Sequence, residues 1–282
     1  MEENRQNIWK LIFVIAVFLT IAGLIGVCIY LYNVYTGGNE YEDFKNKVRV
    51  SSSATEQIYT GNPSNEDTPD APLDNVAPDI VRDTVNGGIN FTELWKINPD
   101  LYAWIKIPNT MVDYPVAQYS GDDDEYYLHH NMYKESAFAG CIYTEKENKK
   151  DFSDPNTVLY GHNMQNGSMF RGLHSFQDKS FFDANDKIYI YLSQRTLTYK
   201  IFSAYEYDDR HLLKSFDFSN KEEFKNYLEY AQNPTASLTF NKRDVDITTD
   251  DKIITLSTCL GSSGSSRYLV QGVLIKDEPA KS

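Results

Sequence analysis

Hydrophobic and polar positions divide the chain into three stretches with different patterns. Residues 11–32 are apolar and carry no charged side chain, residues 50–86 are polar and rich in proline, and from Asn90 onward short apolar runs alternate with polar turns. The third pattern is typical of β-strands separated by loops. We therefore expect a membrane-length helix, a linker without a core of its own, and one folded domain.

The apolar run at residues 11–32 has the length of a transmembrane helix. At the rise of an α-helix it would span about 33 Å, close to the thickness of the hydrocarbon core of a bilayer. It is too long for the apolar part of a signal peptide, and no small-residue cleavage site follows it. Arg5 and Lys10 precede the run, although Lys45 and two further cations follow it. We expect a single-pass anchor in the cell membrane, with residues 1–10 in the cytoplasm and the domain outside the cell.

Residues 33–86 are predicted to form an extracytoplasmic spacer that is largely disordered. Four prolines fall between positions 63 and 78, and no aromatic residue follows Tyr59 in this stretch. Such a segment buries too little apolar surface to fold. We expect it to hold a domain at residues 87–277 away from the membrane, with a short tail at 278–282 after the domain.

Eight runs within the domain have the length and composition of β-strands, and few helices interrupt them. This predicts a mostly β domain folded as a closed or nearly closed barrel. The predicted strands are "YAWIKIP", "MVDYPVAQ", "AGCIYTE", "NTVLYGH", "KIYIYLS", "TLTYKIFSAYEY", "KIITLST" and "RYLVQGVLI".

Three segments of the domain are predicted to be helical. "NFTELWKINPD" begins with a capping residue and is stopped by Pro99, which predicts a short helix on the flank of the domain. "GSMFRGLHSF" is the second, and "SNKEEFKNYLEYAQN" is the third, with Ser219 or Asn220 as its cap. The third helix lies in a long insertion, residues 209–251, between two strands, and long insertions usually serve function.

Composition excludes some classes of partner and site. The formal net charge is −13 and the sequence pI is about 4.8, which argues against nucleic acid, because phosphate contacts need a basic face. Neither an HExxH nor a CxxC pattern occurs, so we expect no metal site and no cofactor.

Cys259 is the strongest candidate for a nucleophile. It ends an apolar strand and is followed by the small, flexible run "LGSSGSS". Cys28 lies inside the apolar run near the N-terminus, and Cys141 occupies a strand position where a free thiol behaves as a small hydrophobe. A disulfide between Cys141 and Cys259 remains an alternative in an oxidising compartment. A reactive cysteine acts as the thiolate, so it needs a basic or cationic neighbour.

One histidine and one arginine are placed to supply that neighbour. Of five histidines, His129, His130, His174 and His211 lie in loops or on helix faces, whereas His162 ends a buried strand, as Cys259 does. Arg267 follows Cys259 by eight residues and begins the last strand, so a return loop would bring it beside the cysteine. A guanidinium there could stabilise an oxyanion.

These residues carry a resemblance to the sortases. "TLSTC" matches the TLxTC signature of that family, "YGHNM" resembles its histidine strand, and Arg267 stands where its arginine follows the cysteine. Residues 90–276, including "NPDLYAWIKIPNTMVDYPVAQ" and "NTVLYGHNMQNGSMFRGL", resemble class B sortases. The C-terminal membrane helix and the N-terminal lid of pilin-polymerising class C enzymes are missing. The resemblance implies a closed eight-stranded β-barrel with an N-terminal helical flank and a helix-bearing insertion before the cysteine strand.

The resemblance also implies an activity and partners. Such an enzyme is a cysteine transpeptidase that cleaves an NPxTN-like or xPxTG-like sorting signal near the C-terminus of a Gram-positive surface protein. It then transfers the protein to the amine of a lipid-linked peptidoglycan precursor. By this resemblance Cys259 is the nucleophile, His162 the general acid and base, and Arg267 the oxyanion and substrate clamp. Thr258 and Ser257 would line the peptide groove, although Ser257 holds the variable position of the signature.

Several other functions remain open at this level. A class B enzyme could polymerise pilins rather than anchor proteins, and a sortase-like barrel could serve as an inactive surface-binding protein. Papain-like peptidases place the cysteine before the histidine, the reverse of this chain. L,D-transpeptidases carry the histidine next to the cysteine, where this chain has Thr258 and Leu260. The order of the three residues therefore favours the sortase hypothesis.

Overall fold

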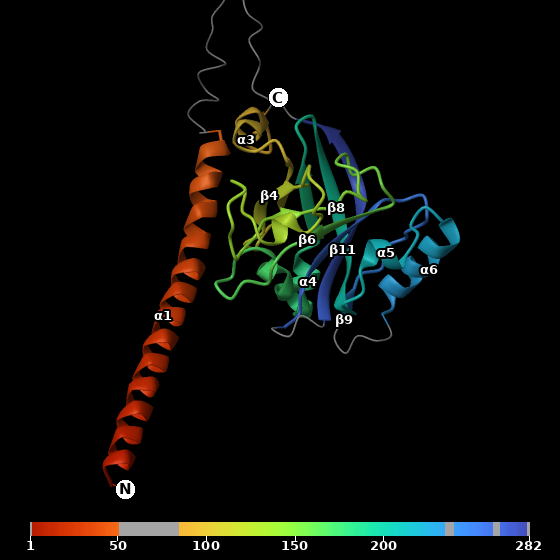
Figure 1. Cartoon of the computed structure of the whole chain (residues 1–282). Helices are drawn as coiled ribbons and strands as arrows, with labels where there is room; N and C mark the ends of the chain where they lie inside the picture. Colours follow the sequence, from red (N-terminus) through yellow and green to blue (C-terminus); the bar gives the residue numbers. More distant parts are fainter. Residues whose placement is uncertain (1, 51–84, 235–239, 262–265, 281–282) are drawn as a thin grey trace, which may run out of the picture.

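The structure is a computed structural model, and it describes residues 2–50, 85–234, 240–261 and 266–280. Most of the predicted spacer, residues 51–84, lies outside these ranges, as do residue 1 and the last two residues. The described part of the domain is a β-barrel with short helices around it, and a long helix, α1, stands to one side (Figure 1).

Eight strands close into a ring in the order β11, β10, β6, β5, β4, β3, β7, β8, and β8 pairs again with β11. This confirms the predicted eight-stranded barrel, with all eight expected runs as its strands. Their bounds are β3 Leu101–Lys106, β4 Asp113–Ala117, β5 Ile142–Tyr143, β6 Asn156–Tyr160, β7 Lys187–Tyr191, β8 Arg195–Asp208, β10 Ile253–Cys259 and β11 Ser266–Pro279. A short strand, β9 (Phe240–Lys242), adds to β8 outside the ring, and β1 (Val85–Asn86) pairs with β2 (Ile89–Asn90).

The strands that carry the candidate residues are buried on both faces. In β10, Ile254 and Leu256 join the core inside the barrel, whereas Ile253 packs in a second core under the insertion. This double burial explains why "KIITLST" is apolar almost throughout rather than alternating. A strand held from both sides presents its last residue in a fixed position.

The helices follow the predicted capping chemistry. The flanking helix α3 (Phe91–Ile97) begins at Asn90, whose side chain accepts from the backbone N–H of Glu93. In the insertion, α6 (Lys221–Gln232) is capped by Asn220 and follows the short α5 (Leu212–Ser215). The remaining short helices are η1 (Tyr126–Leu128), η2 (Phe170–Gln177) and α4 (Lys179–Ala184); η2 realises the predicted "GSMFRGLHSF" helix in 3₁₀ form.

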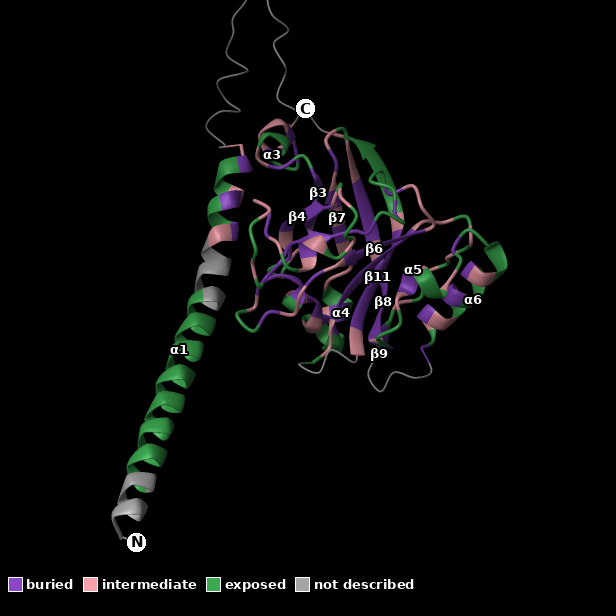
Figure 2. Cartoon of the chain, viewed as in Figure 1, coloured by how far each residue is buried: buried purple, intermediate pink, exposed green. Residues whose placement is uncertain are grey.

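The helix α1 (Glu2–Val48) extends beyond the predicted anchor and corrects the expected start of the spacer at residue 33. Tyr41, Phe44 and Val48 are buried against the domain, and Figure 2 shows that buried residues of α1 gather at its C-terminal end. These residues are spaced three and four apart, so they share one face of the helix. The apolar run ends at residue 32, but the helix continues to Val48. Its last part packs against the domain through this apolar face.

Candidate active site

Cys259 and Arg267 meet across two neighbouring antiparallel strands. Cys259 is the last residue of β10, and Arg267 is its register partner near the start of β11. The Nη1 of Arg267 donates to the Sγ of Cys259 at 3.8 Å. The return loop therefore brings the strand start beside the strand end, as the eight-residue spacing predicts.

His162 reaches the same place from a parallel strand. The strands β6 and β10 are parallel neighbours, with Tyr160 opposite Ser257, so the residues that follow each strand leave the sheet at the same edge. His162 and Cys259 both line one cavity at that edge. The structure thus brings all three predicted residues together.

The contacts of His162 define which ring nitrogen is available. Its Nε2 donates to the backbone carbonyl of Leu128 at 2.8 Å, because a carbonyl oxygen can only accept. The Nδ1 is then the nitrogen left to exchange a proton. Burial lowers the pKa of His162 and the neighbouring His129 lowers it further, while the bond to Leu128 acts in the opposite direction. The ring of Phe138 stacks on it, with ring centroids 6.1 Å apart.

The cavity that holds these residues has a volume of about 240 Å³. Its walls come from the ends of β6 and β8, from β10, from the start of β11 and from the first residues of the insertion. The lining residues are Glu125, Leu128, Tyr143, Glu145, Tyr160, Gly161, His162, Tyr207, Asp209, Arg210, His211, Leu212, Ser257, Thr258, Cys259, Arg267 and Leu269.

Ser257 and Thr258 both line this cavity, and both are buried. The backbone carbonyl of Ser257 accepts from the N–H of Gly161 at 3.2 Å, which continues the pairing of β6 with β10 past the last strand residue. The Oγ1 of Thr258 is buried without a hydrogen-bond partner among the described residues. Side chains alternate along β10, so that of Thr258 faces the barrel interior with Ile254 and Leu256 and points away from Cys259.

Two residues that the sequence did not single out hold the nucleophile's backbone. Asn163 Nδ2 donates to the carbonyl of Cys259 at 2.9 Å, and His174 Nε2 donates to the same oxygen at 3.1 Å. The ring of His174 also stacks on Tyr268, with centroids 5.3 Å apart. Asn163 directly follows His162, which is the one signal in the sequence that could have indicated it.

A hydrogen bond between His211 and a buried carboxyl group joins the insertion to the barrel at the edge of the cavity. His211 Nε2 donates to Glu145 Oε1 at 2.8 Å, and His211 Nδ1 accepts from the backbone N–H of Lys214. Glu145 is 4% exposed, and burial raises its pKa. Among the described residues, the second carboxyl oxygen of Glu145 and the hydroxyls of Tyr160 and Tyr207 have no hydrogen-bond partner. These three polar atoms are buried in the walls of the cavity.

The remaining cysteines take no part in this site. Cys28, Cys141 and Cys259 are all free thiols, so the alternative disulfide between Cys141 and Cys259 is not formed. Cys141 is buried, and burial raises the pKa of its thiol to about 12. It behaves as the small core hydrophobe that its strand position predicts.

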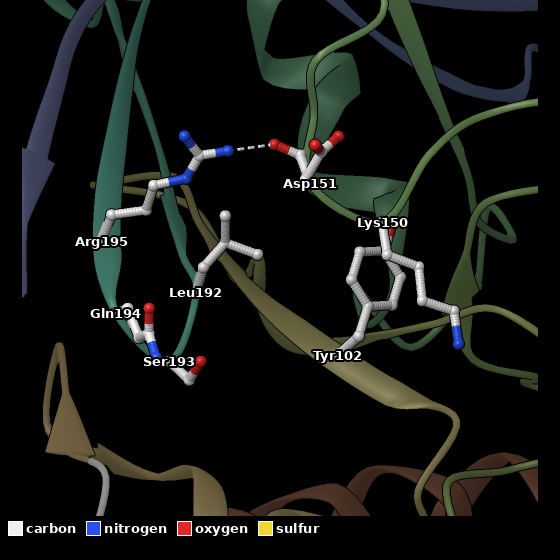
Figure 3. A pocket seen from close by; sticks show the side chains of 7 residues that line it. All are labelled: Tyr102, Lys150, Asp151, Leu192, Ser193, Gln194 and Arg195. Carbon is white, nitrogen blue, oxygen red and sulfur yellow. Dashed lines mark hydrogen bonds between the residues drawn. The ribbon is translucent and has the colours of Figure 1, made fainter.

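A larger cavity of about 520 Å³ lies at the other end of the barrel (Figure 3). It is lined by Tyr102, Lys150, Asp151, Leu192, Ser193, Gln194 and Arg195. Arg195 donates to the backbone carbonyl of Asp151 and forms an ion pair with Asp277. In the ladder between β8 and β11, Arg195 pairs with Pro279 and Tyr207 with Arg267, which places the two cavities at opposite ends. Neither cysteine nor histidine lines this cavity, so it does not share the chemistry of the Cys259 cavity.

Comparisons with known proteins agree with this geometry. The sequence model of the sortase domain family matches residues 105–275. The chain is 33% identical to sortase B of Listeria monocytogenes over 201 residues, which covers 70% of this chain and 79% of that protein.

Solved structures show the same similarity. The crystal structure of Clostridium perfringens sortase B superposes with a TM-score of 0.59 at 38% identity, covering 66% of this chain and 100% of that chain. A Staphylococcus aureus sortase B–substrate complex gives the same TM-score at 29% identity, covering 66% and 85%. The chain belongs to the sortase family and groups with its class B members.

Proposed function

We propose that this chain is a membrane-anchored transpeptidase that joins secreted surface proteins to the cell wall. It cleaves a sorting signal near the C-terminus of such a protein and transfers the protein to an amine of a lipid-linked peptidoglycan precursor. The observation that carries the proposal is the register pair of Cys259 and Arg267 in one cavity with His162. The substrate-bound structure of the Staphylococcus aureus relative supports a peptide as the first substrate.

In the first half of the reaction, the Cys259 thiolate attacks the carbonyl carbon of the scissile peptide bond. The carbonyl oxygen takes up negative charge, and Arg267 stabilises it from beside the sulfur. The C–N bond then breaks, and protonated His162 gives its proton to the leaving amine. A thioester and a neutral imidazole result.

In the second half, an amine of the precursor attacks the thioester carbonyl, and neutral His162 removes a proton from it. The C–S bond breaks and the thiolate leaves, so both the thiolate and the imidazolium are restored. Acid and base catalysis of this kind contributes about 10² to 10⁴ in rate. Thr258 and Ser257 line the peptide groove in this scheme.

The membrane anchor of the proposed enzyme is the first part of α1. Within the described residues, one helix is long and apolar enough to cross a membrane, at Trp9–Tyr32. We infer that it does so with the N-terminus in the cytoplasm, which places the barrel outside the cell with both substrates. Holding the enzyme at the surface where the lipid-linked acceptor resides raises their effective concentration.

The experiment that tests this function uses the full chain in detergent. It is incubated with quenched peptides that carry NPxTN-like and xPxTG-like motifs, with and without an added amine, beside Cys259→Ala as the matched control. We expect cleavage of one motif class by the wild type, a peptide–amine product, and a thioester on Cys259 in the mass spectrum. Equal inactivity of wild type and Cys259→Ala across both motif classes would overturn the proposal.

A further inference from the structure

The helix α1 is attached to the barrel by a specific interface rather than by a few loose contacts. The ring of Phe44 stacks parallel to Trp104, and the hydroxyl of Tyr41 donates to the carbonyl of Gly140 at 2.5 Å. One turn beyond, Arg49 forms an ion pair with Asp113 at 2.6 Å. Buried aromatic contacts and a paired charge fix both the position and the rotation of the helix on the barrel.

The apolar span and this interface belong to one continuous helix. The span ends at Tyr32, and Tyr41 is buried in the interface. At 1.5 Å per residue these two points lie about 14 Å apart along the axis. Residues 51–84 follow the interface in the chain, so the path from the span to the barrel through Tyr41 and Phe44 does not include them. The connection is a stiff helix.

The loop that follows His162 contacts the end of the span. Tyr30 OH donates to Gln165 Oε1 at 2.8 Å. Trp9 lies at the other end of the same span, and aromatic residues at both ends of a transmembrane helix mark the two interfaces of the bilayer. Gln165 therefore lies at the depth of the lipid headgroups whenever the span is in a membrane.

We propose that α1 acts as a rigid strut that holds the catalytic end of the barrel on the membrane surface, with the loop at residues 163–168 in contact with the lipid headgroups. This rests on the membrane anchoring proposed above. The loop exposes the uncharged polar side chains of Gln165 and Asn166, which suit the hydrogen-bonding headgroup region. Its first residue, Asn163, also binds the carbonyl of Cys259.

With α1 as a strut, the two ends of the barrel lie at different distances from the membrane. Arg267 and Pro279 are twelve residues apart on β11, which corresponds to about 40 Å along a strand. Gln194, beside the second cavity, lies at the Pro279 end, since its backbone carbonyl accepts from Ala280. The catalytic cavity therefore opens close to the bilayer, where a lipid-linked acceptor presents its amine, and the opposite end lies far from the lipids.

The test measures position rather than catalysis, so it is carried out in the Cys259→Ala background. A fluorescent amino acid is placed at Asn166 or, as the matched control, at Gln194; both positions are exposed. The full chain is then reconstituted into nanodiscs whose lipids carry a nitroxide on the headgroup. We expect at least twofold quenching at position 166 and no significant quenching at position 194. Equal quenching at the two positions, or none at position 166, would overturn the strut.

A second comparison tests the interface itself. Phe44→Ala should reduce the quenching at position 166, whereas Phe240→Ala, which changes an exposed phenylalanine outside the interface, should not. Circular dichroism checks that the barrel remains folded. If Phe44→Ala unfolds the barrel, the Tyr30→Phe variant is used instead. It removes only the hydrogen bond to Gln165 and should broaden the range of depths at which the fluorescent label at position 166 lies in the membrane. Unchanged quenching in both variants would count against the strut even if peptide cleavage is normal.

Discussion

Cys259 and Arg267 are direct register partners on β10 and β11, and the guanidinium reaches the sulfur at 3.8 Å. Side chains of such a pair project to the same face of the sheet, so the cation stands beside the attacking atom without any loop having to close. The oxyanion of the tetrahedral intermediate forms next to that sulfur. This geometry supports the proposed role of Arg267 in stabilising the transition state.

We expect Arg267→Lys to lose about 10² to 10³ in kcat while retaining the charge. Lysine lacks the planar fork of donors, and the loss of one oxyanion donor typically costs about 2.7 to 4 kcal/mol in the transition state. Steady-state cleavage of the preferred peptide measures the change. Arg210→Lys, which alters another arginine of the cavity lining, is the control. Turnover of Arg267→Lys within a few fold of wild type would remove the arginine from the mechanism.

The pH dependence of the amine-transfer step should report the lowered pKa of His162. Neutral imidazole is the form that accepts a proton from the incoming amine, and burial favours that form. The acidic limb of the pH–rate profile should therefore have its midpoint below 6.5, the ordinary value for histidine. Phe138→Ala uncovers the ring and should move the limb upward. A midpoint at or above 6.5 in the wild type would contradict this assignment.

The two donors to the carbonyl of Cys259 should act as a pair. Asn163→Ala removes one of the two hydrogen bonds to this carbonyl, worth about 0.5 to 1.5 kcal/mol, together with a bond from Arg171, and should lower kcat/KM by up to about tenfold. His174→Phe retains the stacking on Tyr268 and removes the other bond. The double variant should lose more than either single variant, since the carbonyl is then left without a side-chain donor. Asn166→Ala, in the same loop, should show none of these losses.

The hydrogen bond between Glu145 and His211 should affect substrate binding more than turnover. Glu145→Ala frees the start of the insertion, which forms one wall of the cavity, so KM should rise by about tenfold while kcat stays unchanged. Glu145→Gln retains an oxygen that can accept from His211 and should restore most of the affinity. Glu147→Ala, at a neighbouring exposed glutamate, serves as the control. A fall in kcat with constant KM would indicate a role in the chemistry instead.

Replacing residues 51–84 by a short flexible linker should leave membrane-bound activity unchanged. The two ends to be joined are already adjacent. The backbone N–H of Val50 donates to the carbonyl of Gly88, and Arg49 forms an isolated antiparallel β-bridge with Ile89. If this segment set the distance between membrane and domain, shortening it would reduce transfer to a lipid-linked amine. Transfer to a soluble amine measures the intrinsic activity of the same variant.

The barrel and its three central residues could be predicted from the sequence because their signals are local. Strand periodicity, the ends of two apolar runs and the spacing from Cys259 to Arg267 are visible in single segments. Asn163 and His174 could not be assigned, because their target is a backbone carbonyl about a hundred residues away in the chain. The docking of α1 was missed for another reason. The docking face consists of only three apolar residues, Tyr41, Phe44 and Val48. They follow the long apolar run at residues 11–32, which is the dominant hydrophobic signal in this part of the sequence.

The closure of β11 onto β8 has a consequence for the biogenesis of the enzyme. The strand that completes the ring is the last in the chain, and it also carries Arg267. His162 and Cys259 are likewise brought together by the pairing of β6 with β10, strands distant in sequence, and such pairings form late in folding. Until β11 has paired with β10 and β8, the ring is open and Cys259 lacks its register partner Arg267. The candidate site is therefore complete only after the strand nearest the C-terminus has joined the sheet.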